Sequence, residues 1–453
     1  MASKVYYMDD RAKAIQDSLV AKMLTVFEAA GLQNTISPGD TVAIKLHMGE
    51  YNNTAYLRPV YARALADKIK DLGGEPMVVD TTTLPYTPFA SRTTALDYLN
   101  TAYRNGYTPA TLGCPVIIGD GFLGADDVRV DLPEGFILKE QYVATAIAMA
   151  DAMIALTHFK GHPMGVYGGA IKNIGVGCAS KKGKYNLHMG GHPKYGLNAR
   201  PFYPQLCKKS DCASMALCNT VCPENALHIS DEGIIWQREK CTGCSACFGI
   251  LVMCGVGFIP DDYFDSAAAA MADSAKAVMN TFKPGKVGFI NMAIDMSPWC
   301  DCVSFSDRSF LPNLGVFASM DPVAIDVACL DMATNSYGVP GSIAEEKGVM
   351  EPGIRKLTSC GSVIGVDEMI QPNTGEKNGL GKKEYELITV PQPENVLPFL
   401  PSMKTVGIKL RPFYGIEHVM PEGGFKRKLD VDLEEVRGNG VGLHGKTHPS
   451  KAH

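Results

Sequence analysis

The spacing of the cysteines is the feature that most constrains what this chain can fold into. Eight of its fourteen cysteines lie between residues 207 and 254, in the runs "CKKSDCASMALCNTVCP" and "CTGCSACFGILVMCG". Cytosolic thiols stay reduced, so cysteines clustered in this way indicate a metal site rather than disulfides. The segment is therefore expected to bind metal.

The second run predicts one complete cluster site. It contains the spacing Cys241-x2-Cys244-x2-Cys247, and the first run ends in Cys222-Pro223. In two-cluster ferredoxins, three cysteines of one run bind one cluster and the fourth cysteine of the other run completes it. This pattern assigns Cys241, Cys244, Cys247 and Cys222 to a 4Fe–4S cluster. Structural zinc on four thiolates is the alternative.

The other cluster site departs from the usual spacing. It would take Cys212, Cys218 and Cys254, with Met215 at the position of the second ligand. The only spare thiolate nearby is Cys207. Three outcomes are open: Cys207 completes a 4Fe–4S cube, three thiolates hold a 3Fe–4S cluster, or the site is empty. We favour Cys207, and so we expect two clusters.

The rest of the chain reads as alternating strands and helices. Short apolar strands are expected at 41–46, 76–80, 114–120, 153–159, 286–293 and 314–319. Helical periodicity between the first two predicts a β-α-β unit with parallel pairing. The expected fold is therefore α/β, with a mostly parallel sheet and flanking helices, interrupted by an inserted ferredoxin-like α+β iron–sulfur module. The predicted boundaries are 1–200 and 263–365 for the α/β domain, 201–262 for the module, and 366–453 for a loop-rich extension.

Polar residues follow three of these strands. Lys45 and His47 end the first strand, Asp80 ends the second, and His158 ends the fourth and leads into Lys160 and His162. In open α/β sheets, ligands bind at the carboxyl ends of the strands. The sequence thus predicts a crevice there, with His158, Lys160 and His162 as the candidate catalytic residues.

A glycine-rich stretch, "GVYGGAIKNIGVGCASKKGK", follows this strand. Its exposed N–H groups and lysines suit a phosphate or a carboxylate. The candidate ligands of an anion or substrate are Lys45, His47, Lys172, Asn173, Lys182 and Lys184. His188 and His192 are further candidates, as metal ligands or proton donors. Alternatively, the glycines only allow close packing and the lysines are solvated.

A third soft site is suggested by Cys300-x-Cys302 together with Cys178. These thiols could bind a metal, or Cys300 and Cys302 could form a redox-active pair. In an extended segment both side chains would face the same way, whereas in a helix they would diverge. The alternative is that all three are core cysteines.

Several stretches resemble the domain-of-unknown-function family 362. They include "HFKGHPMGVYGGAIKNIGVGCASKKGKYNLH" at 158–188, "DMSPWCDC" and "MDPVAIDVACLD", and the resemblance spans about residues 40–335. The family comprises iron–sulfur proteins of anaerobic bacteria and archaea, often with an inserted ferredoxin-like segment. The resemblance implies the fold and the cofactor class, and it leaves the substrate open.

Composition excludes some classes of function. The net charge of -5 gives no reason to expect a nucleic-acid partner. The longest apolar run, 143–156, is too short for a membrane span and contains Asp151. No signal-peptide pattern opens the chain, so a cytoplasmic location is expected.

These observations predict an oxidoreductase that passes electrons through its clusters to a substrate or cofactor in the crevice. A flavin there is conceivable, although no flavin fingerprint is present. The alternatives are an electron-carrier subunit of a larger redox complex, or a maturation factor that handles metal through the third soft site. The expected partner is a redox protein or a small-molecule substrate, and a homo-oligomer is compatible with the sequence.

Overall fold

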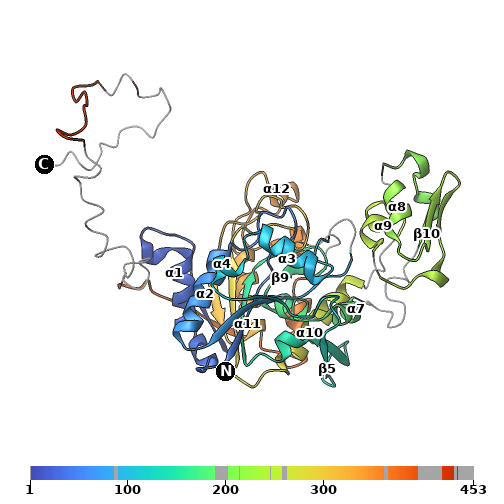
Figure 1. Ribbon diagram of the computed structural model, residues 1–453, viewed down its shortest axis with the longest axis horizontal. Coiled ribbons are helices and arrows are strands. Elements are labelled where there is room, and N and C mark those ends of the chain that lie inside the picture. The colour runs from blue at the N-terminus through green and yellow to red at the C-terminus, as the bar shows by residue number, and fades with distance from the viewer. Residues whose placement is uncertain are drawn as a thin grey trace. The chain divides into compact units, whose positions relative to one another are not determined.

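An eight-stranded sheet forms the frame of the protein (Figure 1). The computed structural model describes residues 2–85, 90–188, 202–213, 215–244, 246–257, 263–361, 366–395, 421–432 and 436. The chain divides into two units, Met1–Val396 and Leu397–His453, and all that follows concerns the first. The strand order is β14-β1-β13-β12-β7-β2-β3-β4. These strands are β1 (Ser3–Met8), β2 (Thr41–Lys45), β3 (Glu75–Asp80), β4 (Val116–Ile118), β7 (Ala152–His158), β12 (Val287–Ala293), β13 (Gly315–Ser319) and β14 (Tyr385–Thr389).

The sheet is mostly parallel, as the sequence predicts. Every pairing within it is parallel except the two that β13 makes, with β12 and with β1. Three two-stranded sheets accompany it: β5 (Asp127–Asp131) with β6 (Glu140–Ala144), β8 (Lys160–His162) with β9 (Val166–Gly168), and β10 (Leu227–Ser230) with β11 (Gly233–Trp236).

Helices cover both faces of the large sheet. Along β2 the side chains alternate, so that Val42 and Ile44 join one hydrophobic core and Ala43 joins the other. The first core includes residues of α1 (Leu19–Ala29), α2 (Pro59–Asp71) and α3 (Ala95–Arg104). The second includes residues of α6 (Ala170–Gly175), α10 (Tyr263–Met279) and α11 (Pro322–Thr334). The shorter helices are α4 (Pro109–Leu112), α5 (Thr145–Ala148), α7 (Lys181–Leu187) and α12 (Ile343–Glu346).

The start of α11 follows from local sequence. Asp321 is its N-cap, and the carboxylate accepts hydrogen bonds from the N–H groups of Val323 and Ala324 at 2.9 and 3.1 Å. Pro322 occupies the first helical position, where a missing N–H costs nothing.

The region after residue 366 differs from the expected loop-rich extension. It contains α13 (Ile370–Lys377), and its strand β14 forms the edge of the sheet by pairing in parallel with β1, a strand that the sequence analysis also missed. Tertiary contacts hold it there: the Tyr385 hydroxyl donates to Asp331 of α11, and the Lys382 N–H donates to Asp321. Short strands such as these are hard to recognise from their residues alone, because they form only where a neighbouring strand is available to pair with them.

The cysteine-rich segment has a hydrophobic core of its own. It contains α8 (Met215–Val221), the β10–β11 hairpin and α9 (Phe248–Met253), and an antiparallel bridge joins Phe202 to Gly257. The buried residues of this core are Cys218, Leu227, Ile229, Ile234, Ile250, Leu251 and Val256. The predicted domain boundaries at 201 and 262 lie outside the described residues and stay predictions.

No helix in the described ranges combines the length and the apolar character needed to cross a membrane.

Candidate functional site

The site lies where the strand order changes direction. From β2 the chain proceeds to β3 and then β4 on one side, whereas β7 pairs with the other side of β2 and is followed outward by β12. Such switch points leave a crevice at the carboxyl ends of the strands. Residues that end β2, β3, β7 and β12 therefore gather at one edge.

Asn173 of α6 ties β2 to β7 at this point. Its side-chain nitrogen donates to the carbonyls of Lys45 and Leu156, both at 3.3 Å, and to the Thr157 hydroxyl at 3.0 Å. Its side-chain oxygen accepts from the Lys45 ammonium at 2.9 Å. The oxygen and the nitrogen of the buried Asn173 amide therefore both have hydrogen-bond partners within the protein. Asn173 is thus better described as a structural clamp than as a ligand of a substrate.

Two buried ion pairs surround the ends of β2 and β3. Lys45 lies 3.0 Å from Asp80, whose carboxylate also accepts from the Tyr98 hydroxyl. Arg92 lies 2.8 Å from Glu50. Buried charges persist in proteins only when they are paired in this way. In these two pairs the charges of Lys45 and Arg92 are each balanced by a carboxylate.

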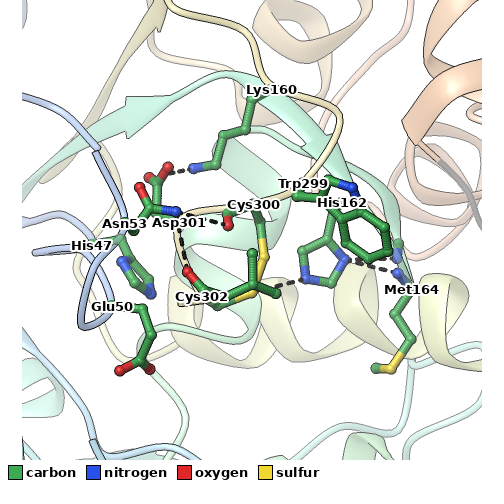
Figure 2. Close-up of a disulfide and its surroundings, with 12 residues drawn as sticks. His47, Glu50, Asn53, Lys160, His162, Met164, Trp299, Cys300, Asp301 and Cys302 are labelled. Atoms are coloured by element: carbon green, nitrogen blue, oxygen red, sulfur yellow. Dashed lines mark hydrogen bonds and ion pairs between the residues drawn. A yellow bond between two sulfur atoms is a disulfide. The ribbon is translucent and has the colours of Figure 1, made fainter. Parts of the chain in front are cut away.

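Asp301 joins the ends of β7 and β12. Its carboxylate lies 2.9 Å from His158 Nδ1. It also lies 2.8 Å from the Lys160 ammonium (Figure 2). His158 Nε2 faces the Ile294 carbonyl at 2.7 Å, so both ring nitrogens face acceptors and the ring is a double donor in its protonated form. Burial acts to raise the pKa of Asp301, but its two cationic partners outweigh burial and hold this pKa well below its usual range.

Among the described residues, Lys172 has no carboxylate partner, whereas Lys45, Arg92 and Lys160 each have one. Lys172 is partly buried, and within the part of the chain that the structure describes it makes no hydrogen bond or ion pair. Burial, followed by the positive charge of Lys160, lowers its pKa to about 7, and Arg92 and Lys45 add to this effect while Asp301 opposes it. Lys172 therefore adds positive charge at this edge of the sheet without a carboxylate partner among the described residues.

His47 adds a neutral polar group to the same place. Its Nδ1 accepts from the Gly49 N–H at 3.0 Å, and its buried Nε2 has no hydrogen-bond partner among the described residues. Burial, followed by the charge of Arg92, Lys172 and Lys160, lowers the pKa of His47 well below its usual value. The ring is therefore an uncharged N–H donor at neutral pH.

Cys300, Cys302 and His162 form a Cys/His group beside these cations. One ligand atom from each lies within 4.8 Å of the other two, a spacing that a metal ion can bridge. The two cysteines are joined as a disulfide, and Cys302 Sγ is 3.9 Å from His162 Nε2 (Figure 2). Burial, followed by Lys172 and Lys160, lowers the pKa of His162 well below its usual value.

The cysteine pair lies on a turn, as Pro298 just upstream allows, and not on a helix. The Val303 N–H donates to the Cys300 carbonyl at 3.3 Å, and this turn brings both sulfurs to one side. Cys178 does not join them, contrary to expectation. It packs in the core with its sulfur 4.0 Å from Met153 Sδ, and burial raises its pKa to about 12. Cys178 belongs to the hydrophobic core because its neighbours are apolar. The third member of the group with Cys300 and Cys302 is His162 instead.

The lysines of the glycine-rich stretch divide into two groups. The buried Lys184 donates to the Thr81 hydroxyl at the end of β3, and burial lowers its pKa to about 8. Lys182 instead has an exposed side chain, paired with Asp127 at 3.2 Å and placed over the ring of Tyr142. The structure thus does not bring Lys182 to the crevice. Burial lowers the pKa of His188 to about 3, and His192 lies outside the described residues.

Sequence reasoning missed four residues of the site: Glu50, Asn53, Arg92 and Asp301. Arg92 and Glu50 lie in loops without a regular pattern, and only the fold pairs them. The sequence did give a reason to consider Asp301. An acidic residue between two cysteines is costly to bury unless cationic partners lie nearby, so its position indicates an ion pair.

The fold and this edge define an α/β protein with a group of lysines and histidines at the switch point of a mostly parallel sheet, next to a Cys/His group. A family model, "Domain of unknown function (DUF362)", matches residues 42–331. The chain belongs to this family, as its resemblance predicted.

Solved structures give weaker likenesses. The lactate racemase apoprotein from Thermoanaerobacterium thermosaccharolyticum is 12% identical with a TM-score of 0.31, over 65% of this chain and 51% of that one. A Thermotoga maritima protein is 10% identical with a TM-score of 0.32, over 63% of this chain and 52% of that one. The match thus spans about half the length of each of these proteins. Comparison with curated proteins gives no match.

Proposed function

We propose that this protein is an iron–sulfur oxidoreductase that binds an anionic substrate in the crevice of its α/β domain. One observation carries the proposal: the thiols of the cysteine-rich segment converge on one small core. Cys218 is buried in that core, and Cys207, Cys222 and Cys247 pack against it. A segment of this size needs a staple beyond its few apolar residues, and iron–sulfur clusters provide one.

The donor set fits two clusters. Burial, followed by the negative charge of Cys254, Cys212 and Cys207, raises the pKa of Cys218 to about 11. These three neighbours are thiols assigned above to the irregular site, Cys207 among them, and a smaller contribution comes from Cys247 of the regular site. Cys207 would thus supply the thiolate that Met215 lacks.

Backbone groups support the same assignment. The Lys209 N–H donates to Cys207 Sγ at 3.4 Å, and the Ala226 N–H donates to Cys222 Sγ at 3.2 Å. Hydrogen bonds of this kind stabilise thiolate ligands and help to set the reduction potential of a cluster.

Zinc is less well supported. Tetrahedral zinc with bonds of about 2.3 Å holds its sulfur ligands roughly 4 Å apart. Among the described residues, the ligand groups whose atoms all lie within 4.8 Å include none of the eight cysteines between 207 and 254. An iron–sulfur cube spaces its four thiolates more widely, because iron and sulfide lie between them.

When bound, the clusters supply single electrons. The chain itself would hold an anionic group of the substrate through Lys172, the one crevice lysine without a partner among the described residues, and would orient it with the free Nε2–H of His47. The buried pair of Lys160 and Asp301 would keep the crevice rigid and exclude water from it.

We expect Lys172→Met to weaken binding of a small carboxylate or phosphate at pH 6 by about ten- to a hundredfold, the usual worth of a hydrogen bond to a charged group. In the wild type, binding should weaken as the pH rises through about 7, because Lys172 loses its charge there. Isothermal titration at several pH values would measure both effects. The control is Lys182→Met, since the exposed Lys182 pairs with Asp127; an equal loss in this control would refute the crevice site.

The iron–sulfur assignment is tested on protein prepared anaerobically from the full chain. We expect about eight iron and eight sulfide per chain, with a visible spectrum that bleaches on reduction and an electron paramagnetic resonance signal from the reduced clusters. Stoichiometric zinc without sulfide after metal-free handling would overturn the proposal.

The exposed thiol of Cys254 favours a second candidate, an electron carrier whose cluster reaches the protein surface. A carrier should transfer electrons to a partner protein at the same rate in the wild type and in Lys172→Met. An enzyme should lose turnover in that variant while keeping its clusters.

A further inference from the structure

We propose that Cys300 and Cys302 form a redox-active dithiol–disulfide pair, with Cys302 as the attacking thiolate and His162 as the hydrogen-bond donor to its sulfur. The substrate class is a small disulfide that carries negative charge. This inference does not depend on whether iron–sulfur clusters occupy the cysteine-rich segment.

The two sulfurs differ in access. Cys300 is fully buried, whereas Cys302 is only partly buried. A disulfide substrate can therefore reach Cys302, while Cys300 is positioned to resolve the intermediate from inside. A dithiol pair needs this division between an attacking and a resolving thiol.

The turn that carries both cysteines is fixed by its surroundings. The side-chain nitrogen of Asn53 donates to the carbonyls of Val303 and Phe305, at 3.2 and 3.1 Å. Asp301, between the cysteines, is anchored to His158 and Lys160. The sulfurs therefore stay within reach of each other without help from a bound ligand.

The hydrogen bonds of His162 favour a role in thiol chemistry over a role as a metal ligand. Its Nδ1 accepts from the N–H groups of Met164 and Gly165 at 3.2 and 2.8 Å. A ring nitrogen that accepts carries no proton, so in the neutral ring the proton is on Nε2. Metal-bound histidines show the reverse arrangement, in which the second nitrogen donates to an acceptor. His162 thus presents an N–H group, not a lone pair, to Cys302.

Close packing holds that N–H group in place. Gly161 donates to the Ser297 carbonyl at 3.0 Å, and a Cβ atom at Gly161 would lie 2.3 Å from the Pro298 carbonyl oxygen. Only glycine allows β8 to approach the 297–302 loop so closely. The neighbouring cations Lys160 and Lys172 would stabilise a thiolate and attract an anionic disulfide.

The reaction is a pair of exchanges. The Cys302 thiolate attacks a substrate disulfide, forms a mixed disulfide and releases one substrate thiolate. The Cys300 thiol then loses its proton to solvent and attacks Cys302 Sγ, which releases the second substrate thiolate, and each released thiolate takes up a proton. The protein dithiol is oxidised by two electrons and the substrate is reduced by two. An external dithiol reverses the sequence and restores the reduced pair.

The test uses the full chain as purified and 5,5′-dithiobis(2-nitrobenzoate), an anionic disulfide. Trypsin releases residues 287–308, a peptide whose only cysteines are Cys300 and Cys302. In the reduced wild type we expect this peptide to become an internal disulfide without a retained label. In Cys300→Ser it should keep one label on Cys302, and in Cys302→Ser its labelling should slow by more than about tenfold. Cys178→Ser is the matched control and should behave as the wild type.

The role of His162 is tested in the same assay. His162→Ala should slow the attack by about ten- to a hundredfold, because a hydrogen bond to the thiolate is lost. His162→Gln keeps an N–H donor and should recover part of the rate. A labelled Cys300 in Cys302→Ser at the wild-type rate would overturn the assignment of the attacking thiol. Stoichiometric Co²⁺ binding to the reduced pair, with thiolate-to-metal absorption, would overturn the proposal in favour of a metal site.

Discussion

Cys207→Ala is expected to lose about half of the bound iron, or to convert one cluster to a three-iron type, because the irregular site then keeps only three thiolates. The buried neighbour Cys218 remains close to Cys212 and Cys254, so partial assembly on these three is plausible chemistry. Iron and sulfide analysis with electron paramagnetic resonance, on anaerobically purified protein, would measure the change. Unaltered iron and an unaltered spectrum would show that Cys207 is no ligand.

Two further variants sharpen this experiment. Met215→Cys in the Cys207→Ala background restores a thiol at the usual spacing, and Met215 already packs against the same small core. We expect this double variant to regain iron. Cys360→Ala is the matched control, because Cys360 is buried outside the cysteine-rich segment. Cys222→Ala should instead damage the regular cluster, since the fourth cysteine of a run crosses over.

Asp301→Asn is expected to lower the free energy of unfolding by about 3–5 kcal/mol, the usual result of removing one partner from a buried ion pair. The variant leaves the ammonium of Lys160 and the doubly donating ring of His158 buried without a counter-charge. Denaturant unfolding of the iron-loaded chain at pH 7 would measure the loss. Asp71→Asn is the control, because Asp71 is exposed at the end of α2.

The pH dependence of this effect has a definite sign. The pKa of Asp301 is lowered in the folded protein, so its stabilisation is complete above the unfolded value of about 3.9 and is lost as the pH falls below it. The difference between the wild type and Asp301→Asn should therefore narrow below about pH 4. A difference that stays constant from pH 7 to pH 3 would contradict the ionised role of Asp301.

Much of the α/β frame was predictable from sequence because its signals are local. β2 and β3 are short apolar runs, and the helix between them repeats its apolar side chains at helical spacing. Asp321 and Pro322 mark the start of α11 by capping chemistry alone. Such elements need only their own residues to be recognised.

The gathering of polar strand ends at one edge of the sheet was predictable as well, but the pairing of the side chains there was not. Lys45 and His158 end strands, Lys160 follows two residues after His158, and parallel pairing brings strand ends together. By contrast, Arg92 and Glu50 meet across 42 positions of sequence, and His158 and Asp301 across 143. Pairings at such separations depend on how the sheet is ordered, and the sequence alone does not state that order.

The sequence by itself therefore determined the class of fold, the family and the set of thiols available for clusters, because these depend on local patterns and spacing. Only the tertiary structure decided which residues act together. In the folded protein Cys178 lies in the apolar core and Lys182 lies at the surface. Lys172 has no carboxylate partner among the described residues, and Cys300 and Cys302 lie next to His162. The physical reason is that burial and charge pairing are properties of neighbours in space, and those neighbours are distant in the chain.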